Sequence, residues 1–299
     1  MKQKFWLPIY LILGLVWGSS FVFIKLGLEF LTPVGVAFGR CALGSMILLI
    51  IVKIRGIKLP TDRKTWFVLW VVSLLLNVFP GLLFAFAQQR VTTVLAGIIN
   101  AFTPLATLIF LFIFFRSEKI KNQQILGLLV GALGVIIVLG IWNGIGSGSG
   151  IGVLALFAAI TCYGLSFPII KKYLSPLNLK AEALAASQVT AGALTLLPFG
   201  LTNGISSNDY RVGPILAMMA LGIFGSGLAY IWNFQIVERA GSSIASSVTY
   251  LTPVVAVFIG WIFLDENITW HEPVGGAIVI LGAAISQGRF SKKVIDKSA

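Results

Sequence analysis

The stretch NAFTP at residues 100–104 is echoed by TYLTP at residues 249–253, an offset of 149 positions. Each proline falls near the middle of a long apolar run, where it removes the helical hydrogen bond to the carbonyl four residues earlier. The carbonyls released in this way belong to Asn100 and Thr249. We therefore expect Pro104 and Pro253 to kink two helices at equivalent positions of an internal repeat.

Further matches extend from this pair of stretches toward both ends of the chain. They keep their order and nearly the same offset, and they comprise Ala96 with Ala245, Glu118 with Glu266, Gly127 with Gly275, Gly134 with Gly282, and WGSSF at 17–21 with YGLSF at 163–167. An uncharged glycine–serine segment, NGIGSGSG, separates the copies. The sequence thus predicts a first repeat at 1–142, a linker at 143–150, a second repeat at 151–290 and a basic tail at 291–299.

Composition places both repeats in a membrane. Hydrophobic residues make up 58% of the 299 positions, charged residues only 11%, and the mean hydropathy is +0.97. A soluble domain carries roughly a quarter charged residues, so this chain has too few to cover a water-exposed surface. The formal charge of +12 comes from short basic clusters between apolar runs, a pattern that suits anionic lipid headgroups and argues against a nucleic-acid partner.

Ten apolar segments are long enough to cross the hydrocarbon core as helices, which takes about 20 residues each. They lie at 5–26, 33–52, 66–87, 92–114, 122–142, 151–170, 179–199, 212–236, 241–264 and 271–288. Because each copy holds five, an odd number, the second copy enters the membrane upside down relative to the first. The expected fold is all-α and integral to the membrane, with ten transmembrane helices as two inverted five-helix repeats around a central cavity.

The basic residues indicate the orientation. If both termini face the cytoplasm, eighteen of the 22 lysines and arginines lie in cytoplasmic segments, and three lie outside, namely Lys25, Arg90 and Arg211. The remaining one, Arg40, lies within a helix. The positive-inside rule then predicts a multi-pass protein of the bacterial plasma (inner) membrane with both termini in the cytoplasm.

Polar and aromatic side chains inside the spans are candidates for the lining of the cavity. Backbone without hydrogen-bond partners at this depth is tolerated only against protein or around a wet cavity, and paired helix breaks point to a transporter's binding site. The candidates are Trp17, Ser20, Asn77, Asn100, Thr103, Tyr163, Ser166, Tyr230, Asn233, Thr249, Tyr250 and Thr252. Together they suit a small zwitterion with an apolar side chain. The alternative is structural, with threonine hydroxyls or neighbouring helices satisfying the carbonyls and the polar side chains joining helices.

Three charged residues complete the candidate site. Arg40 lies about 10 Å below the external end of its helix at 1.5 Å per residue, and a charge at this depth is a functional candidate whose partner has to be named. Lys25 and Glu29 lie at a similar level. The interpretation we favour is a structural ion pair between Glu29 and Arg40. The other interpretation is that Arg40 or Lys25 attracts a substrate carboxylate.

Several other chemistries find no support in the sequence. No carboxylate falls at the midplane of a span, which disfavours proton coupling through a buried acid. A lone histidine, His271, and two cysteines in apolar runs, Cys41 and Cys162, do not suggest a metal site, and no Gly-Lys-Ser/Thr motif suggests a nucleotide. The spans also lack a nucleophile with its base or a pair of carboxylates. We therefore expect neither an enzyme nor a cofactor.

The order of these motifs resembles the EamA branch of the drug/metabolite transporter superfamily. The resemblance rests on WGSSF at 17–21, Phe38-Gly39-Arg40, the Thr-Pro pair followed by Glu118, and their echoes, and it covers nearly the whole chain. It implies ten helices around a central cavity and, commonly, efflux of amino acids or related metabolites.

Repeat, cavity and resemblance together predict a secondary transporter. We expect it to move a small metabolite, an amino acid or a related zwitterion, and to export it by alternating access. The alternatives are a channel-like facilitator and an exporter of other small organic solutes. Beyond its small-molecule substrate and the membrane lipids we expect no obligate protein partner, with the chain acting as a monomer or a homodimer.

Overall fold

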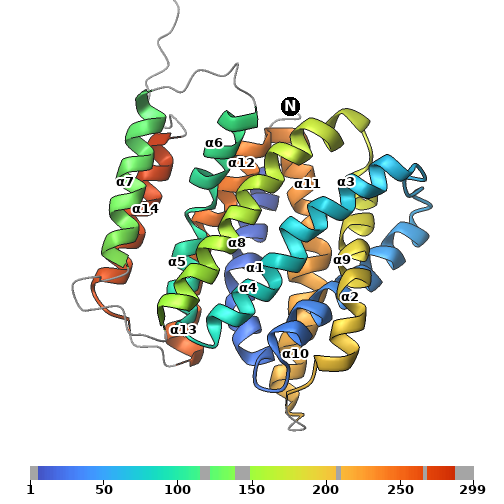
Figure 1. Cartoon of the computed structure of the whole chain (residues 1–299), viewed down its shortest axis with the longest axis horizontal. Helices are drawn as coiled ribbons and strands as arrows, with labels where there is room; N and C mark the ends of the chain where they lie inside the picture. Colours follow the sequence, from blue (N-terminus) through green and yellow to red (C-terminus); the bar gives the residue numbers. More distant parts are fainter. Residues whose placement is uncertain (1–5, 115–121, 139–148, 207–209, 265–267, 287–299) are drawn as a thin grey trace, which may run out of the picture.

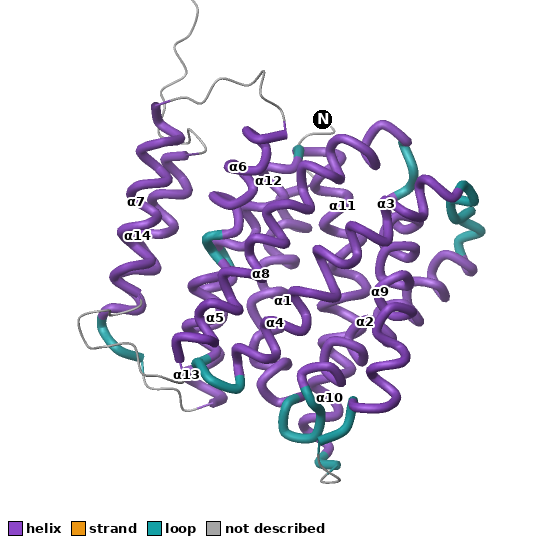
Figure 2. Tube along the Cα trace, viewed as in Figure 1, coloured by secondary structure: helices purple, strands orange, loops and turns teal. Residues whose placement is uncertain are grey.

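The computed structural model describes residues 6–114, 122–138, 149–206, 210–264 and 268–286. Within these ranges the chain is helical apart from short turns and one isolated β-bridge between Leu31 and Ile205. The helices run side by side between two ends of the molecule (Figures 1 and 2). Most of the predicted linker, the matched pair Glu118 and Glu266, and the basic tail lie outside the described residues.

Among the described residues, eight helical segments are long and apolar enough to span a membrane, and they agree with eight of the ten predicted spans. The first half contains α1 (Trp6–Gly27), α2 (Pro33–Ile54), a third segment made of α3 (Arg63–Ser73), η2 (Leu74–Val78) and α4 (Phe79–Gln88), and a fourth made of α5 (Thr93–Asn100) and α6 (Thr103–Phe114). The second half contains α8 (Ser149–Ile169) with η4 (Ile170–Leu174) and η5 (Ser175–Leu177), then α9 (Ala181–Asn203), then α10 (Val212–Ala220) with η6 (Leu221–Leu228) and α11 (Ala229–Ala240), and finally α12 (Ser242–Ser246) with η7 (Ser247–Tyr250) and α13 (Thr252–Leu264). Each half ends in a shorter helix, α7 (Asn122–Val138) with 17 residues or α14 (His271–Ser286) with 16.

Side-chain caps mark the starts of α2 and α3. Thr32 accepts a hydrogen bond from the backbone N–H of Gly35, and Pro33 fills the first helical position of α2. Asp62 caps α3 in the same way, and its carboxylate accepts from the N–H of Thr65 at 2.7 Å. This bond from Thr65 holds the pKa of Asp62 below its ordinary value. Both caps lie at span ends, where a polar side chain stays near water.

Glycines at equivalent positions make equivalent contacts across the two halves. A Cβ at Gly18 of α1 would collide with Val255 of α13, and a Cβ at Gly164 of α8 would collide with Ala106 of α6. Gly18 corresponds to Gly164 and Ala106 to Val255 in the repeat, so the same contact forms twice with the halves exchanged. A two-fold relation between two copies produces this kind of exchange. The internal repeat is therefore present in the packing as well as in the sequence.

The helices α7 and α14 form a close pair that stands at one side of the molecule (Figure 1). A Cβ at Gly134 of α7 would lie 2.9 Å from the carbonyl oxygen of Gly275, and one at Gly282 of α14 would lie 2.7 Å from that of Gly127. Gly127 corresponds to Gly275 and Gly134 to Gly282. Exchanging the two halves therefore converts one of these two contacts into the other. Residue numbers rise along one helix as they fall along the other, so the two helices run antiparallel.

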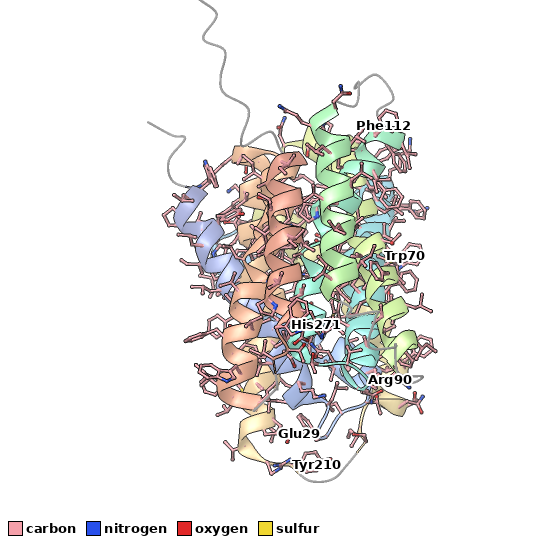
Figure 3. All side chains as sticks on the ribbon, turned by 90° about the vertical axis from the view of Figure 1, so that its left-hand side faces the viewer. Glu29, Trp70, Arg90, Phe112, Tyr210 and His271 are labelled. Atoms are coloured by element: carbon pink, nitrogen blue, oxygen red, sulfur yellow. The ribbon has the colours of Figure 1, made fainter. Side chains whose placement is uncertain are left out.

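The outer surface of the bundle is apolar. Trp261, Phe263 and Leu201 are 61%, 72% and 73% exposed, and side chains such as Trp70 project outward from the sides of the molecule (Figure 3). Serine, threonine and asparagine side chains are buried between the helices instead. An apolar exterior around a polar interior is what hydrocarbon surroundings require. The chain is a multi-pass membrane protein.

Candidate functional site

A cavity lies where the two halves meet, near the midpoint of several spans. The non-atom space at this place is about 580 Å³, a volume that includes open solvent. Its lining consists of Trp17, Ser20, Phe21, Ile24, Arg40, Leu76, Phe84, Asn100, Thr103, Tyr163, Phe167, Tyr230 and Thr249. Seven of the twelve predicted cavity residues are among them. Three pairs occupy corresponding positions of the repeat, namely Trp17 with Tyr163, Phe21 with Phe167, and Asn100 with Thr249.

The fourth span of each half is interrupted at the predicted position. α5 ends at Asn100 and α6 begins at Thr103 (Figure 2), whereas η7 ends at Tyr250 and α13 begins at Thr252. In both breaks a threonine hydroxyl donates to the carbonyl three residues earlier, Thr103 to Asn100 and Thr252 to Thr249, each at 2.7 Å. Threonine hydroxyls thus satisfy both carbonyls, as the structural alternative expected, while Asn100 and Thr249 also border the cavity. A carbonyl oxygen has two lone pairs, so each can accept a second bond.

The two breaks are joined to each other. The amide nitrogen of Asn100 donates to the hydroxyl of Thr252 at 3.2 Å, across the boundary between the halves. Pro104 and Pro253 each follow the first residue of a new helix, in the turn where a missing N–H removes no helical bond. The expectation of two kinked helices is therefore corrected to two helices that stop and restart, with their ends tied together beside the cavity.

Each third span contains a π-helical segment beside the cavity, which the sequence did not predict. The indole nitrogen of Trp17 donates to the carbonyl of Gly225 in η6 at 3.2 Å, and the hydroxyl of Tyr230 donates to the carbonyl of Leu76 in η2 at 2.8 Å. Leu76 and Gly225 are separated by the repeat offset of 149 positions. A π-helical turn disturbs the regular ladder of helical hydrogen bonds. Each half thereby accepts a hydrogen bond from an aromatic side chain of the other.

Aromatic rings form one wall of the cavity. Phe84 stacks on Tyr163 with ring centroids 5.9 Å apart, and Phe21 meets Phe84 edge-on at 5.5 Å. Trp17 meets Tyr230 edge-on at 6.1 Å. These offset and edge-to-face arrangements are the favoured geometries of aromatic pairs. They hold a large apolar surface in place around a small space.

Arg40 reaches this cavity from α2, and the residue is only 5% exposed. One turn further along, Gly44 lets α2 approach η6 closely, since a Cβ there would lie 3.1 Å from the carbonyl oxygen of Gly222 and the Cβ of Ser226. The same approach brings Ser226 to Arg40, whose Nε donates to the serine hydroxyl at 2.8 Å. In the part of the chain that the structure describes, Arg40 is the one charged side chain of the lining.

The predicted ion pair between Glu29 and Arg40 is wrong. Glu29 instead pairs with Arg211 at one end of the bundle, the end at which Figure 3 shows Glu29. The bridge between Leu31 and Ile205 explains this choice, because it draws the segment before Arg211 against the turn after α1. Glu29 thus finds a partner near the surface, and Arg40 stays inside without it.

Lys25 lies off the cavity as well, because its ammonium group donates to the backbone carbonyl of Gln88 at 2.9 Å. The described carboxylates lie off the cavity too. Those that the structure describes are Glu29, Asp62, Glu182, Glu238 and Glu272, and none of these five borders the cavity. The positive charge of Arg40 is therefore not balanced by a described acidic side chain at the site.

Five predicted cavity residues are buried elsewhere: Asn77, Ser166, Asn233, Tyr250 and Thr252. Ser166 donates to the carbonyl of Tyr163 at 2.7 Å, and the amide nitrogen of Asn77 lies 3.4 Å from the hydroxyl of Ser73. Tyr250 packs with Ala101 and Val279 in a small apolar cluster. A polar side chain at membrane depth was therefore not enough to identify the lining.

Sequence reasoning missed the apolar part of the lining, which consists of Phe21, Ile24, Leu76, Phe84 and Phe167. Two of these carried a usable signal, because Phe21 and Phe167 are the matched last residues of WGSSF and YGLSF. The other three have no polar atom and resemble the many apolar side chains that face outward. Only their three-dimensional position separates them from those residues.

A cavity between two repeats, bordered by interrupted spans within an apolar bundle, is the architecture of a membrane transport protein. The chain belongs to the EamA-like transporter family, whose profile matches residues 4–140 and 150–287. The two matched ranges coincide with the two halves of the structure. The family comprises transporters and not enzymes, and the chain is accordingly a membrane transporter.

Relatives of this chain extend over nearly its whole length. An uncharacterized transporter of Archaeoglobus fulgidus is 28% identical over 90% of this chain and 94% of its own. The uncharacterized inner membrane transporter YedA of Escherichia coli is 25% identical over 93% of this chain and 89% of its own. A solved crystal structure superimposes with a TM-score of 0.70 at 20% identity, and the match covers 95% of this chain and 99% of the other. The names of these two relatives specify no substrate, and the structural likeness concerns the fold alone.

Proposed function

We propose that the protein is a secondary transporter that exports a small metabolite, an amino acid or a related zwitterion, by alternating access. The observation that carries the proposal is the cavity, to which both halves contribute side chains at corresponding positions beside two interrupted spans. A site between two repeats can face either side of the membrane when one repeat moves against the other. Its neutral polar atoms suit hydrogen bonds to a zwitterion, and its aromatic wall suits an apolar body.

In this proposal the chain forms ten spans as two inverted five-helix repeats, with α7 and α14 as the fifth and the tenth. The supporting observations are the glycine contacts that recur with the halves exchanged and the antiparallel course of α7 and α14. At 1.5 Å per residue, helices of 17 and 16 residues are about 25 Å long, which crosses most of a hydrocarbon core of roughly 30 Å.

The proposed location is the plasma (inner) membrane, with both termini in the cytoplasm. In Figure 1 the turn between α2 and α3 lies away from the end of the molecule at which α10 begins. That turn carries the basic cluster from Lys53 to Lys64, whereas the opposite end carries Glu29 paired with Arg211. An excess of lysine and arginine in one set of loops favours the cytoplasmic side for that set.

Within the proposed site, Asn100, Thr103 and Thr249 are the neutral hydrogen-bonding groups nearest to the two breaks. Because the bond from Asn100 to Thr252 joins the breaks, a change at one is transmitted to the other. A substrate that competes for the amide of Asn100 would loosen this connection and permit the halves to move. The proposed partners are the substrate and the membrane lipids, with the chain as a monomer or a homodimer.

Counterflow in proteoliposomes tests the proposal. Purified full-length protein is reconstituted, loaded in turn with unlabelled amino acids, sugars and organic cations, and assayed for uptake of the same compound in labelled form. We expect saturable, stereoselective counterflow of at least one amino acid. Counterflow of sugars or cations alone, or of nothing, would overturn the amino-acid proposal, and flux that does not saturate would identify the channel-like alternative.

A matched pair of variants connects the counterflow to the cavity. Asn100→Ala removes a polar group of the lining, whereas Asn122→Ala changes an exposed asparagine at the start of α7. We expect Asn100→Ala to lower counterflow and Asn122→Ala to leave it unchanged. Equal rates for the two variants would contradict the assignment of the site.

A further inference from the structure

Arg40 holds a buried positive charge beside an empty space. Its Nε donates to Ser226, and no partner of its two terminal nitrogens, Nη1 and Nη2, is found among the described residues. The guanidinium is the side-chain group best suited to hold a carboxylate with two parallel hydrogen bonds. A buried cation without a counter-ion is costly, so the arrangement favours a ligand that supplies the missing negative charge.

The second half of the molecule indicates that the fold itself does not need this charge. Gly192 of α9 packs against η2 as Gly44 of α2 packs against η6, and the two glycines are 148 positions apart. One turn before each glycine, α2 carries Arg40 and α9 carries the neutral Gln188. Gln188 is fully buried. The same place in the same helix packing is therefore filled by an uncharged amide, which points to a role for Arg40 beyond packing.

We propose that Arg40 is the carboxylate-binding group of the cavity, that its terminal nitrogens hold the substrate carboxylate, and that Ser226 fixes the plane of the guanidinium. The inference rests on the proposed function and deepens it by defining the substrate class. That class is small organic acids with an apolar or aromatic body, with or without an amino group.

The absence of acidic side chains from the described lining defines the other end of the substrate. An ammonium group in this cavity meets only neutral acceptors, such as the second lone pairs of the Asn100 and Thr249 carbonyls. A carboxylate meets a full positive charge. The carboxylate is therefore the required element, the amino group is optional, and an amine that lacks a carboxylate is rejected.

Direct binding to the purified full-length protein in lipid nanodiscs tests this inference without transport. Two sets of three ligands share one body each: phenylpropionate, phenylalanine and phenethylamine, and isocaproate, leucine and isopentylamine. We expect the acid and the amino acid of at least one set to bind, and the amine to bind at least about tenfold more weakly. Binding of the amine as tight as that of the acid, or no binding of any carboxylate in either set, would overturn the inference.

Variants test the role of the named side chain. Arg40→Gln is expected to weaken carboxylate binding by about 10- to 100-fold, the range for loss of charge-assisted hydrogen bonds, and Arg40→Lys by less, because lysine keeps the charge and loses the planar fork. Arg55→Gln, the same change at a position 62% exposed, is the matched control. If Arg40→Gln fails to fold, Ser226→Ala keeps the cation and is expected to weaken carboxylate binding without strengthening amine binding. Unchanged affinity in the folded variant would overturn the inference.

The two proposals fail in different ways. Carboxylate binding that depends on Arg40 but is accompanied by no counterflow would overturn the transport proposal and keep this inference. Amino-acid counterflow that is the same in the wild type and in Arg40→Gln would overturn this inference and keep the transport proposal.

Discussion

At three positions of the cavity the two halves present similar side chains: Trp17 and Tyr163, Phe21 and Phe167, and Asn100 and Thr249. Another pair of corresponding positions differs in charge: α2 carries Arg40, which borders the cavity, where α9 carries the neutral Gln188, which is buried and is not part of the lining. The glycine contacts around these helices are shared by both halves. The packing of the helices is thus the same in both copies, because both copies need the same close contacts. Charge does not follow the repeat, because among the described lining residues the cation comes from the first half.

The largest expected effect comes from removing this difference. Gln188→Arg would bury a second cation, and a buried charge without a partner costs about 3–5 kcal/mol. We expect a severe loss of folded protein, measured as the monodisperse fraction of a detergent extract. Gln188→Leu, similar in size and uncharged, is the control and should remain folded. A normal yield of Gln188→Arg would show that the second half tolerates a cation and that the difference has no energetic basis.

The bond from Asn100 to Thr252 involves only one of the two threonines that begin the new helices, and a pair of threonine variants measures it. Thr103 donates within its own half, whereas Thr252 both donates to Thr249 and accepts from Asn100 in the other half. We expect Thr252→Val to lower the free energy of unfolding by about 2 kcal/mol and Thr103→Val by about 1 kcal/mol. Thermal unfolding in detergent gives both values. Equal losses would mean that the bond between the breaks contributes nothing.

The double variant Pro104→Ala with Pro253→Ala tests whether the restarted helices shape the site. Alanine permits a continuous helix through each break, which would draw the neighbouring carbonyls away from the cavity. We expect counterflow to fall about tenfold, the equivalent of ~1.4 kcal/mol, with a smaller change in membrane yield. Full activity in the double variant would contradict the proposed role of the breaks. Unequal effects of the two single variants would show which of the two breaks contributes more to counterflow.

The smallest expected effect concerns the π-helical segments. Tyr230→Phe removes the hydrogen bond to the carbonyl of Leu76 and keeps the ring, so we expect a loss of about 1 kcal/mol in the free energy of unfolding. Tyr210→Phe, at an exposed position near the end of the bundle, should change stability by less than about 0.5 kcal/mol. Equal unfolding temperatures would show that the bond is not part of what holds the halves together.

The sequence was sufficient for eight of the ten segments and for the positions of the two breaks, because both depend on local chemistry. About 20 apolar residues and a proline in mid-run have the same consequence wherever they occur. The internal repeat also indicated which positions of the two halves correspond to each other. One such matched pair, Asn100 and Thr249, does border the cavity. These predictions needed no knowledge of how the helices pack.

The partners of the charged residues were not accessible in this way. Arg40 bonds to a serine 186 positions away, and Glu29 pairs with an arginine 182 positions away. The first partner is set by the close helix contact at Gly44 and the second by the β-bridge between Leu31 and Ile205, and no apolar pattern specifies either contact. The same limit explains why Asn77 and Asn100, alike in type and depth, differ in whether they face the cavity.

Because the two copies belong to one polypeptide, the charge of the site need not obey the symmetry of the repeat. A transporter assembled from two identical subunits contains every side chain twice. In such a dimer an arginine at the position of Arg40 would be accompanied by a second arginine on the helix that corresponds to α9, which packs against α2 in this chain. Like charges that share a buried region repel each other. In a single polypeptide the two copies can differ in sequence. One copy can then carry an arginine that the other lacks, so that a single fixed cation serves a single binding site.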